Sequence, residues 1–399
     1  MKNLIIRSGS LRMGGLERVL IEVLKTIDKN KYHLCLIIED DSGDANVFLD
    51  QVPTEIPVYF LKNKEIVAKR AYYRARKKSF FYKILYNLYS VFERRVVLDE
   101  TQKVICKVEK EFGPVDVFLD YDWGARHYVE KLEARKKVIW IHNSLPGLLK
   151  KTSKIKRFGK NLDKYDVVVG ICDEMKEEMQ TLYPFLKDKV TRVYNPFNFD
   201  RILRLSEDQS QLNVDEQQLL EQDYILAVSR LDTVQKDYKT LLKGYALAVK
   251  LGIQEQLYIV GDGSGRAQIE EMISEYGLNE KVVMIGRTTN PYVWMKNANL
   301  FVHSSFYEGF GLVLVEAMIC GRVALCSNCL VGPTEVLGNG KYGALFDVGD
   351  DKGLAEKLVQ LLSNKEALQK YENVLEEQIN KFNSQNIIKE YEKIIDTAV

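Results

Sequence analysis

The chain has 399 residues, of which 46% are hydrophobic and 28% are charged, and its formal net charge is +1. This composition is typical of an ordinary soluble globular protein and excludes a disordered or fibrous chain, and the small net charge argues against a protein held on nucleic acid by its overall field. No apolar run reaches the roughly 18 residues that a membrane-spanning helix needs. The first residues are too polar for a signal peptide and the six cysteines lie in apolar contexts, so we expect a cytoplasmic protein with reduced thiols.

The first half of the chain alternates short apolar runs with amphipathic segments. Runs rich in valine and isoleucine that do not alternate with polar residues predict strands covered on both faces, and hence a mostly parallel sheet with helices on either side. The predicted strands of this half lie within residues 3–9, 32–39, 115–121, 137–143 and 166–172.

Residues 62–95 interleave many basic residues with aromatic and aliphatic ones and contain few acids. This composition suits a helix that lies on an anionic membrane surface with its aromatic rings in the headgroup layer. The same composition also suits single-stranded nucleic acid, through stacking and charge, and a solvated helical face is the common alternative. A second basic stretch at residues 148–160 in the same half favours the membrane. We therefore expect docking on an anionic membrane through Lys62 to Arg95, and no nucleic acid partner.

A polar, acidic segment without strand signal precedes a second half that repeats this plan. Here we expect strands within residues 223–231, 256–263, 281–286, 299–305 and 323–328. The predicted fold class is α/β, with two Rossmann-like, doubly wound parallel-sheet domains facing each other across a cleft. The predicted boundaries are residues 1–198 for the N-terminal domain, 199–222 for a linker, 223–378 for the C-terminal domain and 379–399 for a helix that returns to the N-terminal domain.

The segment from Gly309 onward resembles a helix that is apolar on every side, yet it contains Glu316 and follows Glu308. A buried carboxylate costs several kcal/mol unless it is satisfied. The two carboxylates lie on the order of 10 Å apart along such a helix, which matches the spacing of hydroxyls on either side of the diphosphate of a nucleotide sugar. We therefore expect Glu316 to accept hydrogen bonds from ribose and Glu308 from the sugar. A helix-capping glutamate and a salt-bridged core glutamate are the structural alternative.

A helix that begins near Gly309 would present unpaired backbone N–H groups at its positive end. The N–H groups in question belong to Phe310, Gly311 and Leu312, and the two glycines leave room for a phosphate. This pattern predicts an anion site between the two carboxylates.

The pattern E-G-F-G-L-x-x-x-E-A-M at residues 308–318 resembles the signature of retaining glycosyltransferase family 4. Members of that family have the GT-B fold and use nucleotide-sugar donors. Further elements resemble the family's motifs in the same order along roughly residues 1–350: the glycine loop at 8–20, WIHN at 140–143, YNPFNFD at 194–200, SRLD at 229–232 with Lys236, and NCLVGPTEVL at 328–337. The resemblance implies that the C-terminal domain binds the donor and the N-terminal domain the acceptor.

The resemblance also assigns roles to single residues. It implies that Arg230 and Lys236 neutralise the donor diphosphate, with Lys239 as a substitute because the spacing here is one residue longer than usual. It implies that His142 contacts a sugar hydroxyl or takes part in proton transfer. The implied catalytic residues are Glu308, His142, Arg230 and Lys236. The implied donor-binding residues are Gly14, Gly15, Arg230, Lys236, Arg287, Glu308, Gly309, Phe310, Gly311, Leu312 and Glu316. The backbone of residues 285–287 is expected to contact the nucleobase. Glu17 and Arg18 are expected to hold their own loop and helix.

Three patterns suggest a metal or a dinucleotide and are set aside. The CSNC at residues 326–329 has zinc-like spacing but lacks a second pair of ligands. The GDGSGR at residues 261–266 lacks the acidic ribose ligand about 20 residues later. The DYD at residues 120–122 is the nearest D-x-D motif but lies in the half assigned to the acceptor. We therefore expect no metal and no cofactor besides the nucleotide-sugar donor, and we expect Glu335 to shape its loop near the sugar.

The resemblance implies a retaining, metal-independent glycosyltransferase of hexosyltransferase type. It would move a sugar from a nucleotide sugar, expected to be a UDP-sugar, to a saccharide or lipid-linked glycan at the cytoplasmic face of the membrane, in synthesis of a cell-surface polysaccharide such as lipopolysaccharide. Front-face attack is the expected mechanism, and Glu308 as a covalent nucleophile is its competitor. A nucleotide-sugar epimerase of the same fold would need acids and bases around the second carbon of the sugar. A non-catalytic membrane or nucleic-acid adaptor would explain residues 62–95 but not Glu316.

Overall fold

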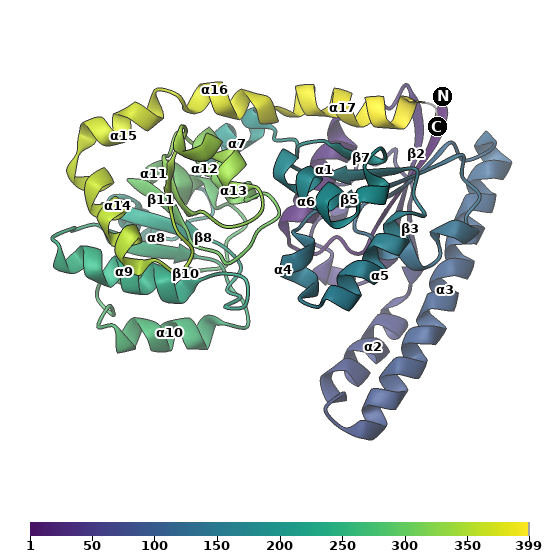
Figure 1. Cartoon of the computed structure of the whole chain (residues 1–399), viewed down its shortest axis with the longest axis horizontal. Coiled ribbons are helices and arrows are strands. Elements are labelled where there is room, and N and C mark those ends of the chain that lie inside the picture. The colour runs from purple at the N-terminus through teal and green to yellow at the C-terminus, as the bar shows by residue number, and fades with distance from the viewer. Residues whose placement is uncertain (398–399) are drawn as a thin grey trace.

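The computed structural model describes residues 1–397, which form two parallel α/β domains joined by two crossings of the chain (Figure 1). Each domain is built around one parallel sheet, and helices cover both faces of each sheet. The predicted fold class is confirmed.

The N-terminal sheet has seven strands in the order β3-β2-β1-β4-β5-β6-β7. Its central strands are buried on both faces, as the unbroken apolar runs predict; Ile5 of β1, for example, pairs with Cys35 on one side and Phe118 on the other. The strands are β1 (Lys2–Ser8), β2 (Tyr32–Asp40), β3 (Val58–Lys62), β4 (Val117–Asp120), β5 (Lys136–Ile141), β6 (Val167–Gly170) and β7 (Val190–Arg192). The covering helices include α1 (Gly15–Thr26), α4 (Leu145–Leu149), α5 (Thr152–Leu162) and α6 (Asp173–Leu182).

The C-terminal sheet has six strands in the order β10-β9-β8-β11-β12-β13. Its centre follows the same rule, since Leu226 of β8 lies between Tyr258 and Phe301 and is fully buried. The strands are β8 (Tyr224–Val228), β9 (Gln256–Val260), β10 (Val282–Gly286), β11 (Leu300–His303), β12 (Ala324–Ser327) and β13 (Ala344–Phe346). The helices are α9 (Tyr238–Lys250), α10 (Arg266–Glu275), α11 (Tyr292–Asn297), α12 (Leu312–Ile319), α13 (Pro333–Val336) and α14 (Asp351–Ser363).

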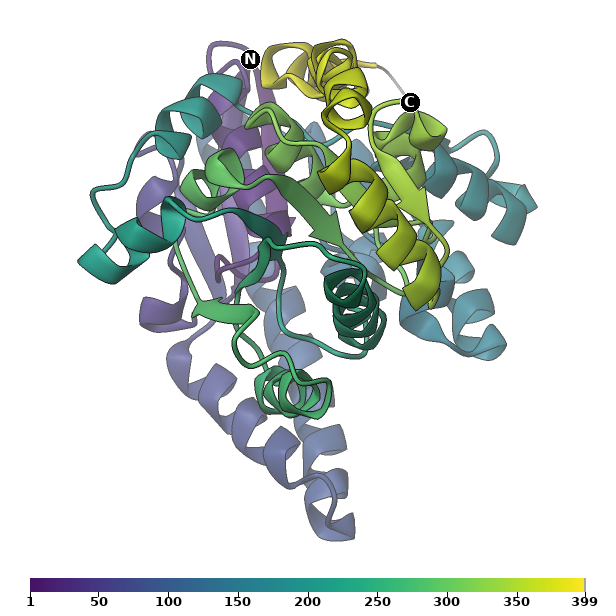
Figure 2. The same cartoon turned by 90° about the vertical axis from the view of Figure 1, so that its left-hand side faces the viewer.

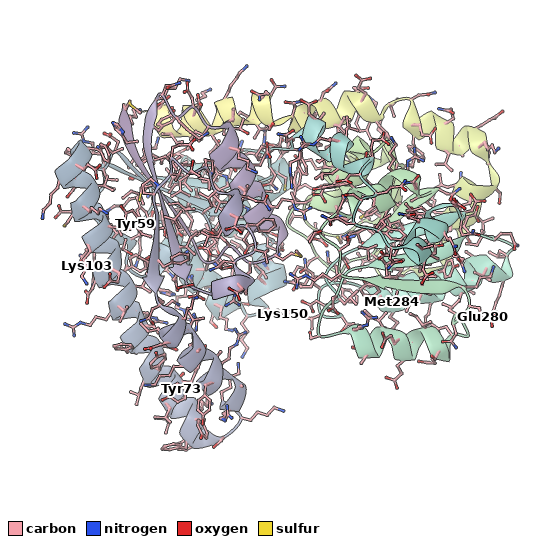
Figure 3. All side chains as sticks on the ribbon, turned by 180° about the vertical axis from the view of Figure 1, so that it is seen from behind. Tyr59, Tyr73, Lys103, Lys150, Glu280 and Met284 are labelled. Atoms are coloured by element: carbon pink, nitrogen blue, oxygen red, sulfur yellow. The ribbon has the colours of Figure 1, made fainter. Side chains whose placement is uncertain are left out.

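A long helical hairpin projects from the N-terminal domain away from both sheets (Figures 1 and 2). It consists of α2 (Lys64–Arg76) and α3 (Phe80–Phe112), and Tyr73 lies near its far end (Figure 3). The prediction of a single helix from Lys62 is therefore corrected. Lys62 is the last residue of β3 and is buried against Glu39, Asp40 and Glu93, because a buried ammonium needs carboxylate partners.

Two short helices occupy the predicted linker, and three more follow α14. The former are α7 (Phe199–Ser206) and α8 (Val214–Leu220), and the latter are α15 (Lys365–Glu372), α16 (Leu375–Ile379) and α17 (Ser384–Asp396). The chain passes between the domains near Phe197 and again near Asn383, and the two crossings lie side by side: Phe197 N donates to Phe382 O at 2.9 Å and Ser384 N to Phe197 O at 2.9 Å. Helix α17 then lies along the N-terminal domain (Figure 1). Residues 398–399 of the predicted terminal helix lie outside the described residues.

Helix α17 is fixed to the N-terminal domain by an aromatic stack and by hydrogen bonds to carbonyl groups near its C-terminus. Tyr391 is fully buried and stacks on Trp140 of β5 with ring centroids 4.8 Å apart. Lys136 of the same strand donates to Ile394 O at 2.6 Å and to Thr397 O at 2.8 Å. The last helix is therefore part of the N-terminal core. Among residues 1–397, no helix combines the length and the apolar character needed to cross a membrane.

Tyr391→Ala is expected to lower the free energy of unfolding by about 3–5 kcal/mol, because it removes a large aromatic side chain from a filled core. Urea unfolding followed by circular dichroism measures this change. Lys389→Ala, on the exposed face of the same helix, serves as the control and should stay within about 0.5 kcal/mol of the wild type. Equal midpoints for the two variants would show that α17 does not contribute to the N-terminal core.

Candidate functional site

The two domains touch where loops after their strands meet, and glycines allow the close approach. A Cβ on Gly309 would lie 2.0 Å from His142 O, and a Cβ on Gly15 would lie 2.6 Å from Leu312 Cδ1. A larger side chain at Gly309 would collide with the backbone of the opposite domain, whereas at Gly15 it would displace the end of the Leu312 side chain. The loops that sequence reasoning named in the two halves are therefore in direct contact.

The predicted helix begins later than expected. Helix α12 starts at Leu312, not near Gly309, because Gly311 has the left-handed backbone φ 82° and ψ 53° that glycine adopts without strain. The segment before it is a tight turn. In the described part of the chain, the backbone N–H groups of Phe310, Gly311, Leu312 and Val313 make no hydrogen bond to a protein acceptor. Four successive free donors at the positive end of a helix form an anion-binding arrangement.

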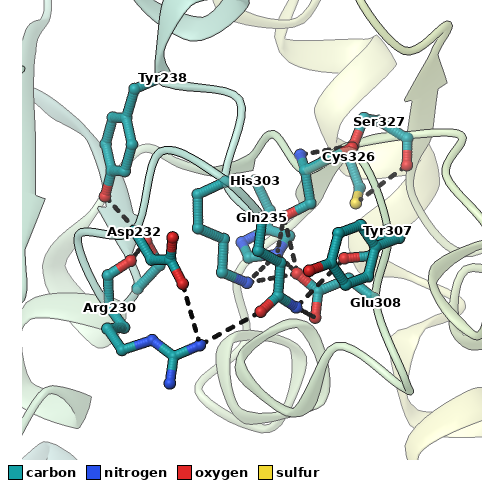
Figure 4. A network of polar contacts seen from close by, with 12 residues as sticks. Arg230, Asp232, Gln235, Tyr238, His303, Tyr307, Glu308, Cys326 and Ser327 are labelled. Atoms are coloured by element: carbon teal, nitrogen blue, oxygen red, sulfur yellow. Dashed lines mark hydrogen bonds and ion pairs between the residues drawn. The ribbon is translucent and has the colours of Figure 1, made fainter. Parts of the chain in front are cut away.

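Glu308 lies at the centre of a buried network of donors in the C-terminal domain (Figure 4). Its Oε1 accepts hydrogen bonds from Lys236 Nζ and from Ser305 Oγ at 2.7 Å, and lies 3.0 Å from His303 Nε2. Its Oε2 accepts from Gln235 Nε2 at 3.3 Å. The carboxylate is therefore fully used by protein groups and satisfies the requirement for burial.

The charges in this network favour an ionised Glu308 and a neutral His303. Burial alone would raise the pKa of Glu308, but the neighbouring Lys236 ammonium and His303 hold it well below its usual value. Burial and then Lys236 lower the pKa of His303. The side chain of Lys236 is 12% exposed, and its contact with Glu308 sets its position. Lys239, the substitute candidate, is exposed on α9 instead.

Arg230 follows β8 and stands at the edge of this network (Figure 4). Its Nη2 lies 3.3 Å from Gln235 Oε1 and 3.5 Å from Asp232 Oδ2. Its side chain is 67% exposed, so most of its N–H donors face solvent. Through Gln235, Arg230 and Glu308 belong to one chain of contacts.

Glu316 is paired across the domain boundary. Its Oε1 accepts from Tyr292 OH at 3.0 Å and from Arg18 Nη1 at 3.2 Å, and Arg18 also donates to Tyr292 OH at 2.8 Å. Its Oε2 has no hydrogen-bond partner in residues 1–397. The side chain of Arg18 extends from α1 to α12, a contact that the prediction for Arg18 did not include. Tyr292 was missed, since nothing in its own segment indicates a carboxylate partner.

Glu335 and Glu174 cap each other's helices from opposite domains. The carboxylate of Glu335 accepts from Asp173 N at 3.0 Å, from Glu174 N at 2.9 Å and from Tyr194 OH at 2.6 Å, at the start of α6. In return, Glu174 Oε2 accepts from Gly332 N at 2.6 Å, at the start of α13. Each carboxylate thus meets unpaired N–H groups at a helix N-terminus. Sequence reasoning placed Glu335 near the sugar and did not detect this pairing.

The remaining predicted residues lie around the same boundary. His142 directly follows β5, with its ring centroid 4.6 Å from that of Tyr121 and its Nε2 buried without a partner among the described residues. Gly14 precedes α1 with an extended backbone. Arg287 follows β10, is exposed, and places its Nε 3.2 Å from Met13 Sδ of the N-terminal domain.

No group of three or more His, Cys, Asp or Glu in residues 1–397 is arranged to hold a metal ion. Cys326 and Cys329 are free and buried, and burial raises the pKa of both thiols. Asp120 and Asp122 both pair with the buried Arg7.

The chain was compared with known families and structures. Residues 209–379 match the model of the family described as glycosyl transferases group 1. An uncharacterized glycosyltransferase from Methanocaldococcus jannaschii is 24% identical over 76% of this chain and 84% of its own length. The N-acetylgalactosamine-N,N'-diacetylbacillosaminyl-diphospho-undecaprenol 4-alpha-N-acetylgalactosaminyltransferase of Campylobacter jejuni is 30% identical over 39% of this chain and 41% of its own length.

Among solved structures, HepE from Anabaena in complex with UDP and glucose superimposes with a TM-score of 0.77 at 18% identity, covering 99% of both chains. That likeness concerns the fold and extends over both domains and the terminal helix. The chain therefore carries the group 1 glycosyltransferase domain at residues 209–379 and is a glycosyltransferase with the GT-B fold.

Proposed function

We propose that the protein is a retaining, metal-independent glycosyltransferase that uses a UDP-sugar and acts on a saccharide or lipid-linked glycan at the cytoplasmic face of the membrane, in cell-surface polysaccharide synthesis. The observation that carries this proposal is the row of free N–H groups from Phe310 to Val313, flanked by Glu308 with its Lys236 and by Glu316 with its Arg18. A diphosphate fits such a row of donors.

The leaving diphosphate would be stabilised by fixed protein charges. Lys236 is fixed by Glu308, and Arg230 has free donors beside it. Together with the N–H groups of α12 they supply the positive charge that a metal ion supplies in other phosphate sites. The free Oε2 of Glu316 would accept from a ribose hydroxyl. HepE, with UDP in its complex, has the same fold and supports UDP as the nucleotide.

Retention would follow from front-face attack. In this step the bond from the anomeric carbon to the phosphate oxygen breaks, the acceptor oxygen bonds to that carbon on the same face, and the acceptor proton passes to the departing phosphate oxygen. Glu308 is a poor nucleophile here, because all its contacts are to protein donors. This argues against a covalent intermediate on Glu308.

His142 would act as a neutral hydrogen-bond partner of the sugar. Burial lowers the pKa of His142 to about 4, so its ring is uncharged at neutral pH. Its buried Nε2 has no partner among the described residues, which leaves a hydrogen-bonding atom available to a sugar hydroxyl.

The helical hairpin would hold the enzyme on the membrane. Residues 64–95 carry ten basic and two acidic side chains, and Phe80, Phe81 and Phe92 are 79%, 64% and 51% exposed. Aromatic rings next to cations suit an anionic lipid surface. The C. jejuni relative has a diphospho-undecaprenol-linked sugar in its name, which supports a lipid-linked acceptor for this chain.

Lys236→Met is expected to weaken UDP binding ten- to a hundredfold, because a hydrogen bond to a charged group is worth about 1.5–3 kcal/mol and ~1.4 kcal/mol is a factor of ten. Metal-free calorimetric titration measures the dissociation constant. The double variant Lys236→Met with Glu308→Gln removes both charges. It therefore tests the loss of UDP binding without leaving an unpaired carboxylate. Lys239→Met makes the same change at an exposed site and should bind like the wild type; equal loss from both lysines would contradict the assigned site.

Acid is expected to destabilise the wild type through His142. Its folded pKa of about 4 lies below the ordinary histidine pKa of 6.5, so the unfolded chain binds the proton first and stability falls as the pH drops from 6.5 toward 4. The loss approaches about 3 kcal/mol, at ~1.4 kcal/mol per pKa unit. Urea unfolding at pH 7 and pH 4.5 should show a smaller decline for His142→Gln than for the wild type. Parallel declines would show that His142 is not held neutral.

Replacing Phe80 and Phe81 by serine is expected to weaken binding to vesicles rich in phosphatidylglycerol at least tenfold, because each buried phenyl ring contributes about 1.5–3 kcal/mol. Co-sedimentation measures the bound fraction, and vesicles of phosphatidylcholine alone give the background. Phe185→Ser changes another exposed phenylalanine of the same domain, 59% exposed, and should have no effect. If the wild type does not bind anionic vesicles, the hairpin has another role.

A further inference from the structure

A second polar pocket lies in the N-terminal domain, at the carboxyl ends of β1, β2 and β4 and at the base of the hairpin. Its volume is about 270 Å³, equal to about nine water molecules at ~30 Å³ each, which suits one sugar unit better than a nucleotide. It is lined by Arg7, Gly9, Ser10, Arg12, Glu39, Asp40, Arg70, Asp122, Trp123, Gly124 and Arg126. None of these residues belongs to the proposed donor site. We call it the arginine pocket.

The guanidinium at the floor of the arginine pocket is compensated within the protein. Arg7 is 1% exposed and pairs with Glu39, Asp120 and Asp122. A Cβ on Gly124 would lie 1.9 Å from Arg7 Nη1, so the glycine is needed to seat the guanidinium. The lining as a whole carries four arginines against three carboxylates, and these carboxylates keep oxygens that accept from hydroxyls.

Two guanidinium groups on the wall lack this compensation. Arg12 donates to Ser42 Oγ at 2.9 Å and Arg126 to Trp123 O at 2.8 Å. Within residues 1–397, neither lies within 4.0 Å of a carboxylate oxygen. Positive charge also acts on the adjacent His127. Its pKa is lowered to about 4, first by burial and then by the nearby Arg126 and Arg94. Uncompensated planar guanidinium groups are the ordinary ligands of phosphate.

An aromatic ring lies beside these cations. Trp123 has a left-handed backbone with φ 63° and ψ 9°, which is uncommon for a residue other than glycine. The ring packs edge-on against Phe158 at 5.1 Å, and the Arg126 guanidinium lies 6.0 Å from its centroid. The indole is thus held at the pocket next to Arg126. Aromatic rings with a few placed polar groups are the usual lining of ligand sites.

We propose that the arginine pocket binds the acceptor as a sugar that carries a phosphate, with Arg12 and Arg126 on the phosphate and Trp123 against the sugar ring. The inference rests on the proposed function, because it names the acceptor of that reaction. Arg70 of α2 also lines the pocket, so the phosphate would sit where the hairpin joins the domain. The same chemistry is present in a sugar linked to a lipid through diphosphate and in a polymer of sugar or polyol phosphates.

The test is a calorimetric titration of the full chain, saturated with UDP, with N-acetylglucosamine 1-phosphate. Binding is expected, at least tenfold tighter than that of N-acetylglucosamine without phosphate. Arg126→Gln and Trp123→Gly should each weaken it at least tenfold, and the glycine takes up the left-handed backbone without strain. Arg135→Gln removes an exposed arginine at the opposite edge of the sheet, where it pairs with Asp116, and should leave binding unchanged.

Three outcomes would overturn the proposal. The two sugars could bind equally, UDP could abolish binding of the sugar phosphate, or both pocket variants could bind it as tightly as the wild type. The titration with UDP alone tests the donor site separately, so a protein that binds UDP but not the sugar phosphate fails this inference and keeps the proposed function. A short-chain prenyl diphosphate sugar in vesicles and a soluble glycerol phosphate oligomer then serve as competitors. Displacement by either one supports the pocket and identifies the source of the phosphate, and displacement by neither contradicts it.

Discussion

The arrangement of the two domains depends on the need to satisfy carboxylates buried between and behind them. An ionised carboxylate removed from water costs several kcal/mol unless donors replace the water. Glu308 finds its donors within the C-terminal domain, Glu316 has one donor from each domain, and Glu335 finds its donors in the N-terminal domain. The pairing between domains can be complete only when the domains are in contact. The positions of α1, α6 and α12 relative to one another therefore follow from charge compensation as much as from apolar packing.

Glycines make this compensation geometrically possible. Gly15 and Gly309 allow backbone to approach within contact distance of the opposite domain, and Gly311 turns the chain so that α12 begins with its N–H groups free. The boundary thus combines positive helix ends and backbone donors with apolar side chains such as Phe310. Such a surface can exchange protein carboxylates for ligand oxygens with little change in its electrostatics.

Much of the fold was accessible from the sequence, because a strand buried on both faces leaves an unbroken run of apolar residues, as residues 138–141 and 224–228 do. The order of the glycine and glutamate motifs also pointed to the correct loops. The first residue of α12 was predicted wrongly, because the sequence alone does not show whether the helix begins after Gly309 or after Gly311. The partners of Arg18 and Glu335 could not be found, because they lie some 298 and 162 positions away in the chain and only the packing of the domains brings them together.

The two side-by-side crossings between the domains have a mechanical consequence. Phe197 and its neighbours from residues 382–384 are joined by backbone hydrogen bonds in both directions, so the two connections form a narrow, flat ribbon at one side of the molecule. A ribbon of this kind bends readily but resists stretching and sliding. It therefore defines an axis about which the domains can swing. The segment before α12 lies next to this axis, because the Phe310 ring centroid is 6.4 Å from that of Phe197 and 5.4 Å from that of Phe382.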